Sequence, residues 1–149
     1  MTALPVTGGC LCGAVRYEAD EAPSRTHYCH CRMCQRHFGN AFGMYTSFHT
    51  ALLRFTAAEP TWYRSSDIAE RGFCGRCGSP VAFRYLPRRE RLGIALGTLD
   101  HPEAVPPEVH WGVESILPWL HIHDRLPRHR TEDDPDFQAA GPAAPAPQP

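Results

Sequence analysis

Short stretches in which apolar and polar residues alternate recur along this chain, and such a period of two predicts β-strands with one buried face. The clearest covers 14–19, where three apolar residues alternate with Arg16 and Glu18. Further strands are expected at 44–48, 52–55, 61–64, 81–85, 91–99 and 109–113. Residues 119–123 fit a strand or a short turn, and 35–43 fit a loop or one short helical turn interrupted by glycines. The pattern therefore predicts a mainly β fold with few short helical turns.

The chain is expected to form one domain with two disordered ends. Residues 1–6 are predicted to be a disordered lead, and the domain is expected over 7–130. The segment 131–149 is first acidic and then rich in Pro and Ala. Because it cannot bury enough apolar surface to offset the entropy of ordering, we expect this tail to be disordered or only lightly tethered.

The overall composition is that of an ordinary globular protein, with 42% hydrophobic and 21% charged residues. With a formal net charge of -1, the chain has no overall positive potential that would attract nucleic acid or a membrane surface. Arginines cluster at 88–91 and 125–130, and a solvated surface is the simpler interpretation of such short runs. No segment reaches the ~20 apolar residues that cross a bilayer, and residues 1–9 lack a secretion signal, so we expect a cytoplasmic protein.

Seven cysteines stand in three dense groups: C-x-C at 10–12, C-x-C-x2-C at 29–34 and C-x2-C at 74–77. In a reducing compartment such spacings favour metal binding over disulfides, and pairing would leave one of the seven thiols over. Glycines beside the first and last groups allow the backbone to turn its N–H groups toward thiolates.

Counting ligands divides the cysteines into two sites. A structural zinc ion takes four ligands, whereas a catalytic one keeps three and leaves a position for water or substrate. A complete four-thiolate set, which would clamp the first strand onto the later sheet, consists of Cys10, Cys12, Cys74 and Cys77. The set left with an open coordination position consists of Cys29, Cys31 and Cys34. Alternatively, a histidine closes this second site as another structural zinc, and the candidates are His27, His30 and His37.

These motifs occur in the same order in one known family. The match is carried by Gly9-Cys10-x-Cys12-Gly13-x-Val15-x-Tyr17, Cys29-x-Cys31-x2-Cys34, Phe73-Cys74-x2-Cys77-Gly78, Gly97-x-Leu99-Asp100-x-Pro102-Glu103, His110, Trp119 and Asp124-x-Leu126-Pro127. Over residues 7–128 the chain resembles the glutathione-dependent formaldehyde-activating (GFA) family, which includes the centromere protein V (CENP-V) domain.

The resemblance implies an Mss4-like fold, in which several small curled antiparallel sheets surround zinc sites. It also implies about two zinc ions per chain, one structural and one catalytic, on the two cysteine sets given above. The family's named reaction joins formaldehyde to the thiol of glutathione and is classed with carbon–sulfur lyases. We therefore expect a small thiol or aldehyde substrate, glutathione as a co-substrate, and no nucleic-acid or membrane partner.

An open three-thiolate zinc site suits a soft ligand. A substrate thiol entering it would lose its proton at neutral pH and could then attack an aldehyde carbon. Arg32, Arg36 and Arg76 are candidates to bind substrate carboxylates through the guanidinium fork, with a surface role as the competing interpretation. His30 and His37 are candidates either for proton transfer or for orienting the metal ligands.

Four further side chains have both a functional and a structural interpretation. By resemblance, His110 and Trp111 lie where the family has a pocket wall, although core packing is the simpler expectation for Trp111. His121 and His123 could bind metal, but the complete cysteine set makes them incidental.

Two other functional classes stay open. The protein could be a non-enzymatic zinc module with two structural sites and a partner-binding surface, which a histidine nitrogen about 2.1 Å from the second zinc would favour. A cysteine redox protein is disfavoured, because redox C-x2-C motifs open a helix, whereas 74–78 lies between strand-like stretches.

Overall fold

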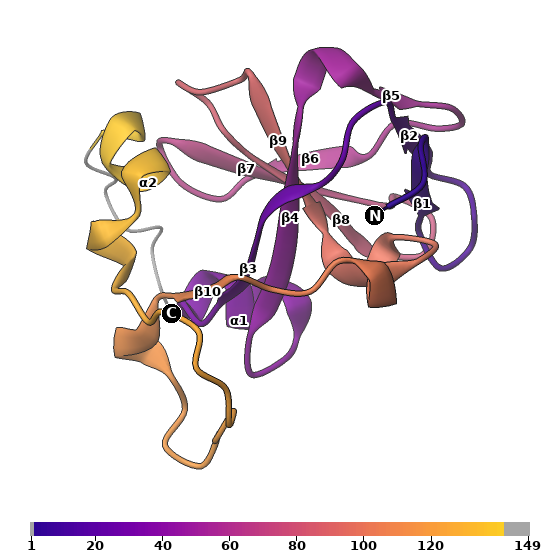
Figure 1. Ribbon diagram of the computed structural model, residues 1–149. Helices are drawn as coiled ribbons and strands as arrows, with labels where there is room; N and C mark the ends of the chain where they lie inside the picture. Colours follow the sequence, from indigo (N-terminus) through magenta and orange to yellow (C-terminus); the bar gives the residue numbers. More distant parts are fainter. Residues whose placement is uncertain (1, 142–149) are drawn as a thin grey trace.

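The computed structural model describes residues 2–141, which form two β-sheets and two short α-helices (Figure 1). The strands of the small sheet are β1 (Val6–Gly9), β2 (Arg16–Ala19) and β5 (Leu53–Phe55). The strands of the large sheet are β3 (Ser24–Cys29), β4 (Gly43–His49), β6 (Thr61–Arg64), β7 (Ala69–Phe73), β8 (Pro80–Tyr85), β9 (Arg91–Ala95) and β10 (Val109–Trp111). The helices are α1 (Arg32–Phe38) and α2 (Pro135–Ala140). The mainly β fold class predicted from the sequence is confirmed.

The small sheet has the antiparallel order β1-β2-β5, and the large sheet has the order β10-β3-β4-β9-β8-β7-β6. Neighbours in the large sheet are antiparallel except β10 and β3, which run parallel. The small sheet lies on the opposite side of the molecule from α2 (Figure 1).

The main apolar core lies on one face of the large sheet. Phe48 on β4 and Leu92 and Ile94 on β9 are buried in it. The small sheet contributes Tyr17 and Ala19, both fully buried. This burial of alternate residues is the pattern that predicted the strands, because successive side chains of a strand point to opposite faces.

The other face of the large sheet forms the floor of a pocket. Tyr45 and Ser47 on β4, Gly93 on β9 and Phe83 on β8 all line it. Gly93 lies in register with Ser47 and Phe83, and it adds no side chain to the floor. The alternation of β4 and β9 thus separates a core face from a pocket face.

Helix α1 begins inside the cysteine-rich stretch, earlier than the loop or single turn expected at 35–43. Cys31 is its N-cap, and the Cys31 sulfur accepts the backbone N–H of Cys34. Gly39, in the left-handed conformation with φ 60, ends the helix. The start escaped prediction because Ser, Thr, Asp and Asn are the usual N-cap signals and a cysteine is not among them.

Other differences from the sequence prediction lie at the ends of elements. The expected strand at 91–99 stops at Ala95 and continues as a 3-10 turn. Residues 119–123 form no strand, and Trp119, His121 and His123 are exposed. Val6, placed in the disordered lead, is buried and opens β1.

The segment expected to be a disordered tail begins with helical structure in its described part. Thr131–Asp133 form a 3-10 turn, and α2 follows with Asp134 as its N-cap. Phe137 and Ala140 pack with Ile68 and Tyr85, which gives this short helix an apolar anchor. Residues 142–149 lie outside the described residues, and the domain boundaries stay predictions. No helix of the described chain is long and apolar enough to span a membrane.

Candidate metal centres and substrate pocket

The structure brings Cys10, Cys12, Cys74 and Cys77 together, with their sulfurs all within 4.8 Å of one another. The first two follow β1, and the other two lie in the turn between β7 and β8. The Cys10–Cys12 and Cys12–Cys74 sulfurs are 3.6 and 3.8 Å apart. A tetrahedron with Zn–S bonds of about 2.3 Å has sulfurs about 3.8 Å apart, whereas a disulfide needs about 2.05 Å. The donor set therefore fits zinc and not a disulfide.

Backbone and hydroxyl donors point at these sulfurs. The N–H of Val15 donates to Cys10 Sγ at 3.2 Å, and the N–H of Cys77 donates to Cys74 Sγ at 3.4 Å. The Ser79 hydroxyl lies 3.2 Å from Cys77 Sγ, and hydrogen bonds from Ser79 lower the pKa of Cys77 to about 5. Such donors stabilise the thiolate form that a metal ion needs.

The second group consists of Cys29, Cys31 and Cys34, whose sulfurs also lie within 4.8 Å of one another. Cys29 ends β3, Cys31 caps α1 and Cys34 lies in its first turn. The loop after β10 packs on this turn at Gly112, where a Cβ would lie 2.8 Å from the Cys31 nitrogen. With φ 71, this position also favours glycine for its backbone conformation.

Among residues 2–141, no histidine nitrogen or carboxylate oxygen joins the three sulfurs of this second group. His30 is fully buried, and its Nε2 lies 2.8 Å from His110 Nδ1, whose Nε2 in turn lies 2.9 Å from Asp124. Burial lowers the pKa of both His30 and His37 to about 4, so both are neutral at pH 7. The group is thus a three-sulfur set whose neighbouring histidines point elsewhere.

One residue beside the sulfurs escaped the sequence analysis. Arg71 on β7 is 4% exposed, and its Nη1 lies 3.6 Å from Cys34 Sγ and 3.1 Å from the Tyr45 hydroxyl. Burial lowers the pKa of Arg71, but its proximity to Cys34 and Tyr45 raises this pKa by more, so the net shift is upward. Arg71 is therefore a buried cation placed against the Cys34 sulfur and the Tyr45 hydroxyl. An arginine on the inward side of a strand, between Ala69 and Phe73, is the signal that could have revealed it.

Sulfur and hydroxyl groups at this site have shifted pKa values. Hydrogen bonds from the thiols of Cys29 and Cys34 lower the pKa of Cys31. Burial, followed by the charge of Cys34, raises the pKa of Tyr45 well above its usual value, so its hydroxyl keeps its proton at neutral pH. The site can therefore hold a thiolate and a protonated phenol next to each other.

The three sulfurs line one end of a pocket of about 460 Å³. Arg71 and Trp111 line it as well, so the expectation that Trp111 packs in the core is wrong. Of the arginines proposed from sequence, Arg32 lines the pocket, whereas Arg36 is exposed and does not line it. Arg76 is exposed beside the four-cysteine group.

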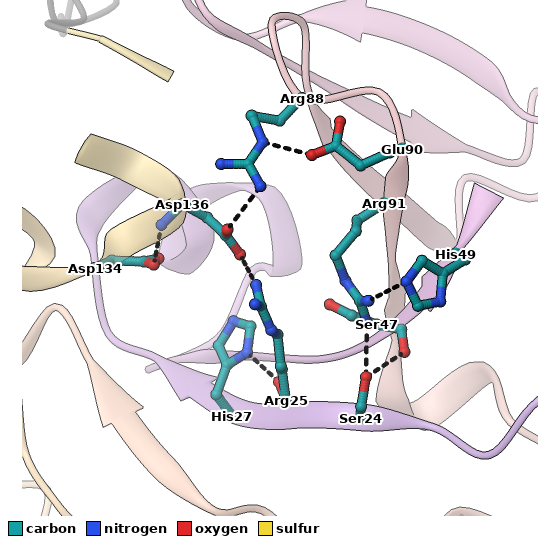
Figure 2. Close-up of polar contacts among 10 residues, drawn as sticks. All are labelled: Ser24, Arg25, His27, Ser47, His49, Arg88, Glu90, Arg91, Asp134 and Asp136. Carbon is teal, nitrogen blue, oxygen red and sulfur yellow. Dashed lines mark hydrogen bonds and ion pairs between the residues drawn. The ribbon is translucent and has the colours of Figure 1, made fainter. Parts of the chain in front are cut away.

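The far end of the pocket is polar, and Asp136 and Phe137 of α2 contribute to its lining. Figure 2 shows the polar contacts at this end. Arg88 pairs with Glu90 at 2.5 Å, and Asp136 of α2 pairs with Arg25 at 2.5 Å. Arg91 reaches across to Ser24 of β3. Arg88 and Arg91 belong to the arginine run that the sequence assigned to a solvated surface, and the structure places both in the pocket lining.

Comparison with known proteins agrees with this geometry. Residues 5–115 match the family described as glutathione-dependent formaldehyde-activating enzyme, and the match includes all seven cysteines. A crystal structure of a Rhodobacter sphaeroides protein superposes with a TM-score of 0.53 at 21% identity, covering 82% of this chain and 98% of the other. At this identity the structural likeness supports the fold alone. On the sequence match over most of its length, this chain belongs to the glutathione-dependent formaldehyde-activating enzyme family.

Proposed function

We propose that this protein is a zinc-dependent carbon–sulfur lyase that forms or cleaves the adduct between a thiol such as glutathione and formaldehyde or a related small aldehyde. The observation that carries the proposal is the placement of Cys29, Cys31 and Cys34 at the end of a pocket, with no histidine or carboxylate as a fourth ligand among residues 2–141. Family membership supports it independently.

Each cysteine group has its own role in this proposal. Cys10, Cys12, Cys74 and Cys77 hold a structural zinc ion, because four thiolates close its coordination. Cys29, Cys31 and Cys34 hold a second ion. When bound there, zinc supplies one open coordination position at which a substrate thiol loses its proton at neutral pH.

The residues around the sulfurs supply orientation and hydrogen bonding. In the forward reaction, a C–S bond forms between the substrate sulfur and the carbonyl carbon, and the proton lost by the thiol ends on the former carbonyl oxygen. The protonated Tyr45 hydroxyl can donate a hydrogen bond to that oxygen as its negative charge develops. Arg71 holds Tyr45 in place and offsets the charge of the thiolates.

The runner-up, a non-enzymatic module with two structural zinc sites, accounts less well for the same features. A structural site needs neither a pocket of about 460 Å³ nor a buried arginine beside its ligands. We place the protein in the cytoplasm, where free thiols and thiol substrates stay reduced. We also propose that it acts on small molecules and not on nucleic acid or membranes.

Adduct formation provides the test. Zinc-loaded protein is added to glutathione and ¹³C-formaldehyde, and nuclear magnetic resonance exchange measures how fast free and adduct formaldehyde interconvert. We expect the protein to accelerate exchange above the uncatalysed rate and Cys31→Ser to abolish the acceleration. Exchange no faster than in buffer, for formaldehyde and other small aldehydes alike, would overturn the proposal.

A further inference from the structure

Five arginines line the pocket, and their partners differ: Arg32, Arg71, Arg84, Arg88 and Arg91. Arg84 pairs with Glu70, and Arg88 pairs with Glu90. Arg71 contacts a thiol, and Arg32 contacts the amide oxygen of Gln35. The fifth, Arg91, contacts a serine and a histidine and forms no ion pair with an acid among residues 2–141.

Arg91 is held in place by a hydroxyl and an imidazole. Its Nη2 donates to the Ser24 hydroxyl at 2.6 Å, and its Nη1 lies 3.1 Å from His49 Nε2 (Figure 2). His49 turns its other ring nitrogen to Glu21 at 2.8 Å, so Arg91 contacts this acid only through an imidazole. Arg91 Nε is buried and has no hydrogen-bond partner in the described chain. Since a guanidinium carries five N–H donors, this arginine is oriented but far from saturated.

The position of Arg91 in the sheet determines how far a group bound by its guanidinium lies from the three cysteine sulfurs. Tyr45 lies beside the sulfur end, and Ser47 and His49 follow it along the pocket face of β4. Ser24, which Arg91 contacts, is in register with Ser47, and the Arg91 backbone is in register with His49. Two to four residues of antiparallel strand span about 7 to 14 Å. An acidic group bound by Arg91 would therefore lie about 7 to 14 Å from a substrate sulfur held at the three-cysteine group.

We propose that Arg91, held in place by Ser24 and assisted by the Ser47 hydroxyl, binds a carboxylate of the substrate thiol and selects thiols whose acid lies well away from the sulfur. This inference rests on the proposed function and adds its specificity. A mercaptoacid with its carboxylate next to the thiol is too short, whereas an extended peptide residue adds about 3.3 Å or more, so a short cysteine-containing peptide fits. The neighbouring Arg25 and Arg88 already face Asp136, which leaves Arg91 as the free cation of this end within the described chain.

The test compares thiols with and without the acid. The initial rate of adduct formation is measured for glutathione, for glutathione with both carboxyl groups esterified, and for 2-mercaptoethanol, using zinc-loaded wild type and Arg91→Gln. We expect Arg91→Gln to lower kcat/KM for glutathione about 10- to 100-fold, mainly through KM, because a charge-assisted hydrogen bond is lost. The two neutral thiols should react equally well with both proteins.

Matched variants separate specificity from folding. Arg89→Gln removes an exposed arginine outside the pocket and should leave all three thiols unaffected. Arg91→Lys keeps the charge and should recover part of the glutathione rate. If Arg91→Gln slows all three thiols equally, or leaves the glutathione rate unchanged, the inference is wrong.

A binding measurement keeps the inference testable if no thiol reacts at all, an outcome that would overturn the proposed function alone. S-methylglutathione has both carboxylates and no thiol. We expect zinc-loaded wild type to bind it at least about 10-fold more tightly than Arg91→Gln, as measured by calorimetry. Equal binding by the two proteins, or no binding to wild type, would overturn the role of Arg91.

Discussion

Arg71 is the residue on which the charge balance of the open site depends. Its guanidinium contacts Cys34 and Tyr45 and lies 5.0 Å from the centre of the Phe83 ring. Replacing it by methionine keeps much of the volume but removes the cation beside the thiolates. We expect Arg71→Met to lower the zinc affinity of the three-cysteine site about 10- to 100-fold, the usual cost of losing a group that supports metal ligands.

Competition with a chromophoric chelator at neutral pH measures this affinity. Arg71→Lys, which keeps the charge but not the fork, should fall between methionine and wild type. Arg76→Met is the matched control, because Arg76 is exposed next to the other cysteine group. Thermal melts of the zinc-loaded variants show whether each is folded, and a folded Arg71→Met that holds both zinc ions as tightly as wild type contradicts the role given to Arg71.

At this residue scale the sequence predicted the sulfurs and missed most of what surrounds them. The cysteine groups were predictable because close spacing along the chain brings ligands together in a turn. Arg71, Tyr45 and Arg91 come from three different strands, and only the order of those strands in the sheet brings them to one pocket. Closeness in sequence does not ensure closeness in space: Arg36 lies near the cysteines along the chain, but on α1 it is exposed and outside the pocket lining.

At the scale of elements, α2 contributes to the lining of the far end of the pocket. Asp136 joins it to Arg25, and its second oxygen lies 3.9 Å from Arg88. We expect Asp136→Asn to weaken this attachment by about 0.5–1 kcal/mol, a value for a partly exposed ion pair. Amide hydrogen exchange in Pro135–Ala140 should accelerate about 2- to 5-fold.

Glu132→Gln supplies the control for α2. It also removes an acid from the C-terminal segment, but Glu132 pairs with Arg130 at 3.1 Å and does not line the pocket. Exchange in α2 should be the same as in wild type. If both variants accelerate amide exchange in α2 equally, the net charge of the C-terminal segment holds the helix in place and the contact of Asp136 does not.

The elements were predictable to the extent that they follow a local pattern. Alternation in β2 reports one buried face, and the sequence shows it directly. It does not report which strand lies beside which, so the parallel pairing of β10 with β3 could not be foreseen. The start of α1 depends on a cysteine as N-cap. Helix α2 is anchored by apolar contacts with Ile68 and Tyr85, two residues that lie far from it in sequence.

For the whole molecule, the two cysteine groups stand in different relations to the fold. The four-cysteine group joins the loop after β1 of the small sheet to the β7–β8 turn of the large sheet. The three-cysteine group is local, since all its members lie between the end of β3 and the first turn of α1. Losing a ligand should therefore disconnect the two sheets in the first case and leave them in contact in the second.

Cys77→Ser and Cys31→Ser test this difference. Metal binding at a closed four-thiolate site contributes free energy comparable to the ~5–15 kcal/mol that stabilises a whole domain, so Cys77→Ser should lose the cooperative thermal transition. Cys31→Ser should keep that transition and contain about one zinc ion per chain instead of about two. Circular dichroism melts and metal analysis of the purified proteins provide both readouts. If the two variants unfold alike, the second site is structural as well, and the open position at Cys29, Cys31 and Cys34 that the catalytic proposal requires does not exist.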